Sequence, residues 1–151
     1  MIPFQKILAP TDFSDPSHRA LEAAIELSRH FSSELILVHV VGSVPVIPTP
    51  ASTTFNVPMY QQEILNDAKT SLDRLMEEKI PKPIRVRPLI IQGEAAHEIV
   101  GTAEKEKADI IVISTHGRTG LDRLMFGSVA EKVVRLSPCP VLTIPAHPEG
   151  K

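Results

Sequence analysis

The sequence predicts an α/β fold in which a parallel sheet is covered by helices on both faces. Short apolar runs of strand length alternate along the chain with longer segments whose apolar residues recur at helical spacing. Such alternation is typical of strands joined by right-handed helical crossovers, which make the strands parallel. Two runs, ELILVHVV at 34–41 and DIIVIS at 109–114, are apolar almost throughout, as expected for strands covered on both faces.

Five segments are predicted as strands. The run at 84–91 alternates arginine with apolar residues and contains Pro88, which favours a position near a sheet edge. The run at 109–114 is expected to be the most buried, because it has the most uniformly apolar sequence. The predicted strands cover residues 6–10, 34–41, 84–91, 109–114 and 140–145.

Four helices are expected between these strands. The first begins after Ser14, a good N-cap residue, and Asp15 and Pro16 suit its first turn. The third follows Gly93 and spans 94–107, and the short fourth helix spans 128–136. The expected apolar faces are Ala20, Leu21, Ala24, Leu27, Ser28 and Phe31 in the first helix, Ile64, Leu65, Ala68, Leu72, Leu75 and Met76 in the second, and Ile99, Val100 and Ala103 in the third.

Residues 42–58 differ in kind from the rest of the chain. The segment GSVPVIPTPASTTFNVP contains a glycine and four prolines, which exclude long regular structure, so we predict a surface loop. A lid or binding loop is one interpretation of such a long segment, and a disordered insertion is another.

Length, charge and cysteine content narrow the class of protein. With 151 residues, we expect one domain over 1–147 and a tail at 148–151. The formal net charge is −2, with 16 Lys and Arg scattered among 18 acids, which disfavours partners such as nucleic acid or an anionic membrane. A leader pattern and an apolar run of about 20 residues are both lacking. The single cysteine, Cys139, fits a reducing compartment, so we expect a cytoplasmic protein.

Candidate ligand-binding residues lie where predicted strands end, because ligands of open parallel sheets bind beyond the carboxyl ends of the strands. This rule indicates residues 10–12, 40–42 and 114–117. The last segment continues as STHGRTGLDRLMFGS, whose glycines let backbone amides approach an anion. Gly127 and Ser128 then begin a helix, whose unpaired amides and partial positive charge favour phosphate.

Several of these residues have an alternative explanation that needs no ligand. Ser128 and Glu131 form an S-x-x-E capping box, which would account for the serine. The glycines could simply serve a loop turn. Asp12 could accept hydrogen bonds from a ribose or an adenine amine, or it could stabilise the strand-to-helix turn with Ser14. Together, at the end of one buried strand, the glycines and Ser128 favour phosphate binding, whereas both explanations of Asp12 stay open.

Other chemistries find little support in the sequence. His97 and Glu98 begin like a zinc protease motif, but Gly101 stands where the second histidine is needed. Cys139 lies between prolines without a nearby base and is expected to be a small buried residue. No P-loop lysine follows a glycine-rich loop, which disfavours fast phosphoryl transfer. We therefore assign no catalytic or metal-binding residue.

Three segments, KILAPTDFSDPSHRAL, ELILVHVV and ISTHGRTGLDRLMFGSVAEKVVRLSPCPVLTIP, resemble the universal stress protein family. The resemblance covers almost the whole chain in order. It implies a three-layer α/β/α fold of the adenine nucleotide alpha hydrolase-like class, with a five-stranded parallel sheet in the order 3-2-1-4-5. The first and fourth strands would then be neighbours at the point where the strand order reverses.

The resemblance also implies a nucleotide site. The ATP-binding branch of the family carries G-x2-G-x9-G-[ST], which Gly117, Gly127 and Ser128 match, whereas Ser114 replaces the first glycine. The Ser114 side chain could crowd a phosphate, so we expect ATP, with or without magnesium, at an affinity that depends on this serine. Asp12 would contact the ribose or base, the Val40 backbone the adenine, and Ile113 would flank the site. The implied nucleotide-binding set is Pro10, Thr11, Asp12, Val40, Ile113, Ser114, Gly117, Arg118, Gly127, Ser128 and Val129.

Not every residue of this motif has an implied contact. Arg118 belongs to the set without one, and His116 is expected to be a solvated loop residue. The final strand, PVLTIP, is short, apolar and bounded by prolines, as expected of an edge strand that needs cover. The resemblance implies a homodimer in which this strand, through Val141, Leu142, Thr143 and Ile144, pairs with its twofold mate.

The function most consistent with these patterns is a homodimeric stress-response binding module that holds ATP and acts on a protein partner. Two alternatives stay open at this point. One is a stress protein that acts through protein contacts alone or binds a different small molecule, which Ser114 motivates. The other is a slow ATPase on the same fold, because a fold alone does not decide function.

Overall fold

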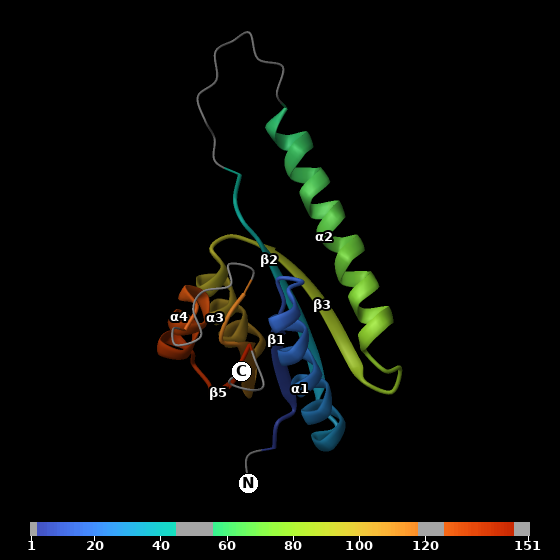
Figure 1. Ribbon diagram of the computed structural model, residues 1–151, viewed down its shortest axis with the longest axis vertical. Helices are drawn as coiled ribbons and strands as arrows, with labels where there is room; N and C mark the ends of the chain where they lie inside the picture. Colours follow the sequence, from blue (N-terminus) through green and yellow to red (C-terminus); the bar gives the residue numbers. More distant parts are fainter. Residues whose placement is uncertain (1–2, 45–55, 118–125, 147–151) are drawn as a thin grey trace.

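The computed structural model describes residues 3–44, 56–117 and 126–146 (Figure 1). Strands and helices alternate along these residues, as the sequence predicts. The elements are β1 Lys6–Pro10, α1 Asp15–Phe31, β2 Glu34–Val41, α2 Val57–Lys79, β3 Arg85–Gln92, α3 Ala95–Glu106, β4 Ile110–Ser114, α4 Ser128–Leu136 and β5 Val141–Ile144.

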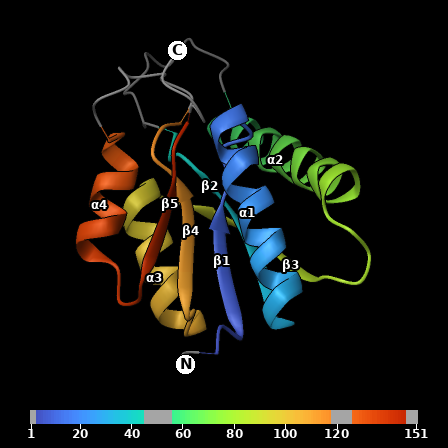
Figure 2. The same ribbon diagram turned by 60° about the horizontal axis from the view of Figure 1, so that its bottom comes forward.

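The strands form a single five-stranded sheet in the order β3-β2-β1-β4-β5, and every neighbouring pair is parallel. Helices α1 and α2 cover one face and α3 and α4 cover the other (Figure 2). The predicted three-layer fold, strand order and central pair of β1 and β4 are therefore confirmed. The chain leaves β1 toward β2 on one side and leaves β4 toward β5 on the other, so the strand order reverses between β1 and β4.

The sheet separates two hydrophobic cores. Ile7 packs into the core beneath α1 and α2, whereas its neighbour Leu8 packs into the core beneath α3 and α4, and both are fully buried. This alternation follows from the two-residue period of a strand. The prediction that the fourth strand is the most buried is confirmed, because every residue of β4 is buried.

Local sequence accounts for the start of α1. The Ser14 hydroxyl accepts a hydrogen bond from the Ser17 amide at 3.3 Å, and Pro16 lies in the first turn, where its missing N–H costs nothing. Of the expected apolar face, Ala20, Leu21, Ala24 and Ser28 are buried, and Leu27 and Phe31 are partly buried. The predicted N-cap and core face are thus confirmed.

Helix α2 starts earlier than predicted, so the expected loop at 42–58 is wrong at its carboxyl end. The Asn56 side chain caps the helix by accepting from the Met59 amide at 3.2 Å, and Pro58 lies in the first turn. Residues 45–55 of the expected loop and the expected tail at 148–151 lie outside the described residues. The buried residues of α2 are Ala68, Leu72 and Leu75, and its first turns extend beyond the sheet (Figure 1).

The remaining boundaries agree within a residue or two, with one error of interpretation. Strand β3 is an edge strand, as Pro88 indicates, and the prolines at 140 and 145 flank β5 at the other edge. Helix α3 is capped by Glu94, whose carboxylate accepts from the His97 amide at 2.9 Å. The capping-box explanation of Ser128 is wrong, because Gly127 is the N-cap of α4 and Ser128 is already helical.

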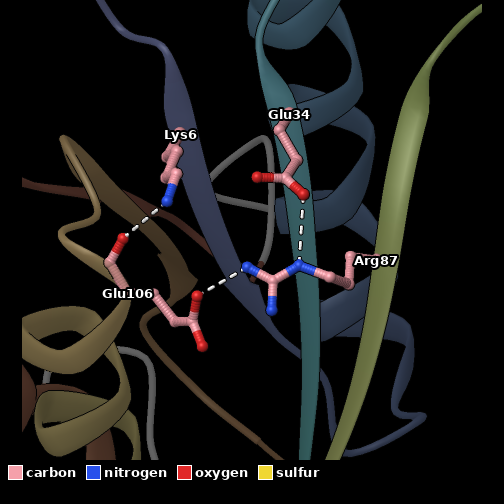
Figure 3. Close-up of polar contacts among 4 residues, drawn as sticks. All are labelled: Lys6, Glu34, Arg87 and Glu106. Atoms are coloured by element: carbon pink, nitrogen blue, oxygen red, sulfur yellow. Dashed lines mark hydrogen bonds and ion pairs between the residues drawn. The ribbon is translucent and has the colours of Figure 1, made fainter.

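An ion cluster ties four elements together at the amino end of the sheet (Figure 3). From β3, Arg87 donates through Nε to Glu34 Oε1 on β2 at 3.1 Å and through Nη2 to Glu106 Oε2 at the end of α3 at 2.6 Å. From β1, Lys6 Nζ donates to the Glu106 carbonyl at 3.1 Å. The hydrogen-bonded guanidinium holds the pKa of the Glu106 carboxyl below its usual range, and the two carboxylates raise the pKa of Arg87.

Cys139 is less enclosed than expected. It is half-buried and packs against the core beneath α3 and α4. Its Sγ lies 3.6 Å from the Ser137 hydroxyl. Burial raises the pKa of the thiol, although the Ser137 hydroxyl acts in the opposite direction.

Candidate functional site

A pocket of about 260 Å³ opens at the carboxyl end of the sheet, where β1 and β4 lie side by side. This is the position that the strand order predicts for a ligand. Its volume lies just below the roughly 300–1,000 Å³ that is typical of small-molecule sites. The described lining residues are Pro10, Thr11, Asp12, Ser17, Val38, Val40, Ala95, Ile99, Ile113, Ser114, Thr115, His116, Gly117, Gly127, Ser128, Val129 and Ala130.

The structure brings the predicted site residues together around this one pocket. All of them line it except Arg118, which lies outside the described residues. They come from the ends of β1, β2 and β4 and from the first turn of α4. Their convergence follows from the strand order, because β1 lies between β2 and β4.

Sequence reasoning missed a further part of the wall. The start of α3 contributes Ala95 and Ile99, one helical turn apart, and β2 contributes Val38 on the same face as Val40. Applied to the carboxyl end of the third strand as well, the strand-end rule would indicate the start of α3. Ser17 and Ala130 are also missed, whereas Thr115 and His116 lie within the predicted segment 114–117 but outside the implied nucleotide-binding set.

The expectation that His116 is solvated is wrong. Only 9% of this residue is exposed, and it lines the pocket. Its Nδ1 lies 2.9 Å from the hydroxyl of Thr115. A residue that follows the end of β4 is thus part of the pocket wall.

The walls and the rim of the pocket differ in chemistry. Val40, Ile99 and Ile113 supply apolar wall, together with Val38, Ala95 and Ala130. Asp12 is the one carboxylate among the described lining residues. Apolar walls with a few placed polar groups are typical of sites that hold an aromatic ring system and orient it by hydrogen bonds.

The first turn of α4 forms one side of the pocket. The first intrahelical bond runs from the Glu131 amide to the Gly127 carbonyl at 3.0 Å, so helix geometry leaves the amides of residues 128–130 without an intrahelical acceptor. Ser128, Val129 and Ala130 all line the pocket. Together with the positive end of the helix dipole, this turn favours a phosphate or another anion.

Gly127 allows α4 to start close to β4. Its amide donates to the Thr115 carbonyl at 2.7 Å, and a Cβ atom at this position would lie 3.1 Å from the same oxygen. A larger residue would therefore press the first turn of α4 away from the strand. The small residue at 127 positions the amides of the following turn.

Asp12 stabilises the turn before α1 and also lines the pocket. Its Oδ1 accepts hydrogen bonds from the Ser14 amide at 3.0 Å and from the Ser14 hydroxyl, so it stabilises the turn before α1. It also lines the pocket. The turn therefore orients the same carboxylate that faces the ligand position.

Ser114, at the position of the missing glycine, is 8% exposed and lines the pocket. Its hydroxyl donates to the His116 carbonyl at 2.7 Å. The side chain is thus bonded to the backbone of the turn after β4, and it links the end of β4 to that turn.

Two further properties concern metals and membranes. Within residues 3–44, 56–117 and 126–146, no three His, Cys, Asp or Glu side chains gather in a way that could hold a metal ion. Across the same part of the chain, no helix combines the length and apolar character needed to cross a bilayer.

Comparison with known families gives a match over residues 3–145 to the model of the universal stress protein family. The chain belongs to the universal stress protein family. Among its relatives, universal stress protein YxiE of Bacillus subtilis is 35% identical over 147 residues, which cover 93% of this chain and 99% of YxiE. Universal stress protein MJ0531 of Methanocaldococcus jannaschii is 34% identical over 141 residues, which cover 93% of this chain and 82% of MJ0531.

Solved structures of universal stress proteins share the fold. The structure of MJ0577 from M. jannaschii superposes with a TM-score of 0.79 at 30% identity, over 98% of this chain and 100% of that one. A universal stress protein from Archaeoglobus fulgidus, solved in complex with dAMP, gives a TM-score of 0.65 at 25% identity, over 95% and 99% of the two chains. The ligand in that structure, dAMP, is an adenine nucleotide.

Proposed function

We propose that this universal stress protein binds an adenine nucleotide, ATP in the first instance, in the pocket between β1 and β4. The observation that carries the proposal is the meeting of three features around one pocket. These are the anion-binding first turn of α4, the Asp12 carboxylate, and apolar walls that include Val40 and Ile113. The dAMP complex of the A. fulgidus relative supports the same class of ligand.

Each feature suits one part of a nucleotide. Phosphate oxygens would accept hydrogen bonds from the amides of residues 128–130. Asp12 would accept from ribose hydroxyls or from the adenine amine, because a carboxylate only accepts. The Val40 backbone would meet the edge of the base, and Ile113 would pack beside it. A magnesium ion that accompanies the nucleotide would lie at the phosphate end.

The test is calorimetry of ATP with magnesium on protein stripped of bound nucleotide. We expect saturable binding in the wild type and its loss in Gly127→Val, because the added side chain would press on the Thr115 carbonyl. Gly101→Ala is the matched control, since nothing lies within 4 Å of a Cβ there. Absence of heat up to millimolar ATP would refute the proposal.

Two companion measurements separate the alternatives. The mass spectrum of small molecules released by denaturing the purified protein identifies any other ligand. Steady phosphate release that disappears in Gly127→Val would indicate a slow ATPase, whereas release that survives this change would indicate a contaminant. With binding and no release, the protein is a nucleotide-responsive regulator.

Two substitutions test how Ser114 affects ATP binding, because its Cβ and its hydroxyl could change the affinity in opposite directions. If the side chain crowds a phosphate, Ser114→Gly strengthens ATP binding. If the bond from its hydroxyl to the His116 carbonyl holds the turn in place, Ser114→Ala weakens ATP binding. Calorimetry of both variants distinguishes the two effects.

The proposed regulator is a homodimer that pairs through β5. The carbonyls of Pro140 and Ile144 accept hydrogen bonds from amides of Ile111 and Thr115, at the β4 side. Because the backbone groups of successive strand residues point to opposite sides, the amides of Val141 and Thr143 point to the open edge of β5. Leu142 on the same strand is 37% exposed. A second copy would supply partners for this edge, and nucleotide binding beside β4 could then alter the dimer and its contact with a protein partner.

A further inference from the structure

His39 lies beside the pocket but on the other side of the sheet. Its neighbours on β2, Val38 and Val40, line the pocket and pack with the core beneath α3 and α4. Because side chains alternate along a strand, His39 faces the side of α1. It is half-buried, and it is not among the residues that line the pocket.

The first contact of His39 is with the backbone that precedes Asp12. Its Nδ1 lies 2.7 Å from the carbonyl oxygen of Thr11. A carbonyl oxygen can only accept, so Nδ1 carries the hydrogen and donates it. The bond extends the pairing of β1 and β2 past the end of β1, where the Thr11 amide already donates to the Val38 carbonyl at 2.8 Å.

The second contact is with the residue that follows Asp12. The rings of His39 and Phe13 lie 4.5 Å apart between centroids, at 41°. Phe13 has a φ of 64°, a left-handed backbone conformation that is disfavoured for any residue with a Cβ atom. Contacts around Phe13 must therefore hold this conformation, and the His39 ring is one of them.

Thr11 and Phe13 are the two neighbours of Asp12 in the chain, so His39 holds the turn on both sides of the carboxylate. The turn is closed further by the Phe13 amide, which donates to the Thr11 hydroxyl at 3.1 Å. A change of backbone conformation at residue 11 or 13 would rotate the Asp12 carboxylate away from its place in the pocket wall.

We propose that His39 is a positioning residue for the ligand, which acts through Asp12 without touching the ligand itself. The bond from Nδ1 to the Thr11 carbonyl is its essential contact, and the ring contact with Phe13 supports it. The inference rests on the proposed function, since Asp12 must contact the nucleotide for its position to matter.

Three substitutions separate the two contacts. His39→Asn retains a donor at the position of Nδ1 but loses the ring, whereas His39→Phe retains a ring and loses the donor. His39→Gln moves the donor one bond further from the backbone. We expect ATP to bind roughly tenfold more weakly to the Phe and Gln variants and within about threefold of the wild type in the Asn variant.

The readouts are calorimetry of ATP binding, thermal unfolding of each variant, and the nitrogen-15 spectrum of the ligand-free protein. The spectrum should show hydrogen on His39 Nδ1, and the amide signals of residues 12–14 should move in the Phe variant and return in the Asn variant. Unchanged affinity in the Phe variant, or an equal loss in the Asn and Phe variants, would overturn the proposal.

The spectrum also separates this inference from the proposed function. If wild-type protein binds no adenine nucleotide, the proposed function fails, and the positioning of the turn is still tested by the signals of residues 12–14. If nucleotide binds but those signals are the same in every variant, His39 does not position Asp12. If the Phe variant does not fold, the Gln and Asn variants test the proposal, because only the Asn variant should keep an ATP affinity near that of the wild type.

Discussion

Gly117 and Asp12 approach each other so closely that a Cβ atom at position 117 would lie 2.6 Å from Oδ2 of Asp12. The turn after β4 thus rests against the turn after β1 at the point where the strand order reverses. An alanine side chain at position 117 would push on the Asp12 carboxylate, so the glycine leaves room for this contact within the protein. One residue therefore sets both the place of the turn and the place of the carboxylate.

We predict that Gly117→Ala weakens ATP binding by about tenfold or more, the size of one displaced polar contact to a ligand. Ser14 already holds Oδ1 of Asp12, so the carboxylate cannot turn aside freely and must shift with its backbone. Calorimetry with ATP measures the effect. Equal affinity in the variant and the wild type would mean that the position of Asp12 does not matter.

Gly101→Ala should raise stability without changing nucleotide affinity. Gly101 is exposed within α3, and a Cβ atom there would meet nothing within 4 Å. Alanine in a helix interior is favoured over glycine by about 1 kcal/mol. Denaturant unfolding should therefore show a later midpoint with an unchanged slope, and a loss of stability would reveal a hidden constraint on this turn of α3.

The Arg87 cluster should contribute stability that disappears in acid. The pKa of Glu106 is lower in the folded protein than in the unfolded chain, because Arg87 hydrogen-bonds to its carboxylate. The ionised Glu106 carboxylate therefore adds to the free energy of unfolding. This addition is complete above the unfolded pKa of about 4.3 and is lost as pH falls through the lower folded pKa. Glu106→Gln should cost about 1 kcal/mol at pH 7, since partial exposure screens the pair, and less at pH 3, below the unfolded pKa.

Urea unfolding at the two pH values tests this dependence, and Glu104→Gln, on the exposed side of the same helix, is the control. A difference between Glu106→Gln and the wild type that is as large at pH 3 as at pH 7 would assign the effect to packing instead of charge.

Cys139 should react slowly with alkylating reagents at neutral pH. Burial raises the pKa of its thiol, so the reactive thiolate forms only at higher pH than in the unfolded chain. Because the folded pKa is the higher one, the thiol contributes stability below the unfolded pKa and loses that contribution as pH rises through the folded pKa. The rate of alkylation by iodoacetamide is measured against pH, in native protein and in protein unfolded by urea. The midpoint of this pH dependence should be higher in the native protein.

Ser137→Ala should move this midpoint further up, since the Ser137 hydroxyl lowers the pKa of the thiol. Coincident midpoints in native and unfolded protein would contradict the predicted effect of burial.

Thr143→Pro should convert the proposed dimer into a monomer while the fold is retained. The Thr143 amide points to the open edge of β5, so its loss removes a bond to a second copy but none to β4. Leu142→Pro is the matched control, because the Leu142 amide points toward β4 and its loss should destabilise the sheet. Light scattering reports the mass, and an unchanged dimer in Thr143→Pro would exclude pairing through this edge.

Local sequence was enough to predict most of the elements. Ser14 was recognised as a cap and Pro88 as a residue of an edge strand, because each depends on short-range chemistry. Ser128 was misinterpreted for the opposite reason: the cap position depends on the backbone angles at Gly127, which the spacing of Ser128 and Glu131 does not reveal. Pro58 likewise suits both a loop and a first helical turn.

The strand ends that form the pocket could also be predicted, since the carboxyl ends of parallel strands meet at one edge of the sheet. The contacts across that edge could not. The sequence by itself determined the alternation of elements, the two buried faces and the glycine-containing turn, because these follow from periodicity and from the conformational limits of single residues. Only the tertiary structure decided that Gly117 meets Asp12, that His116 is enclosed and that His39 holds the Asp12 turn, because these contacts join segments far apart in the chain, whose distances are set by strand order and register.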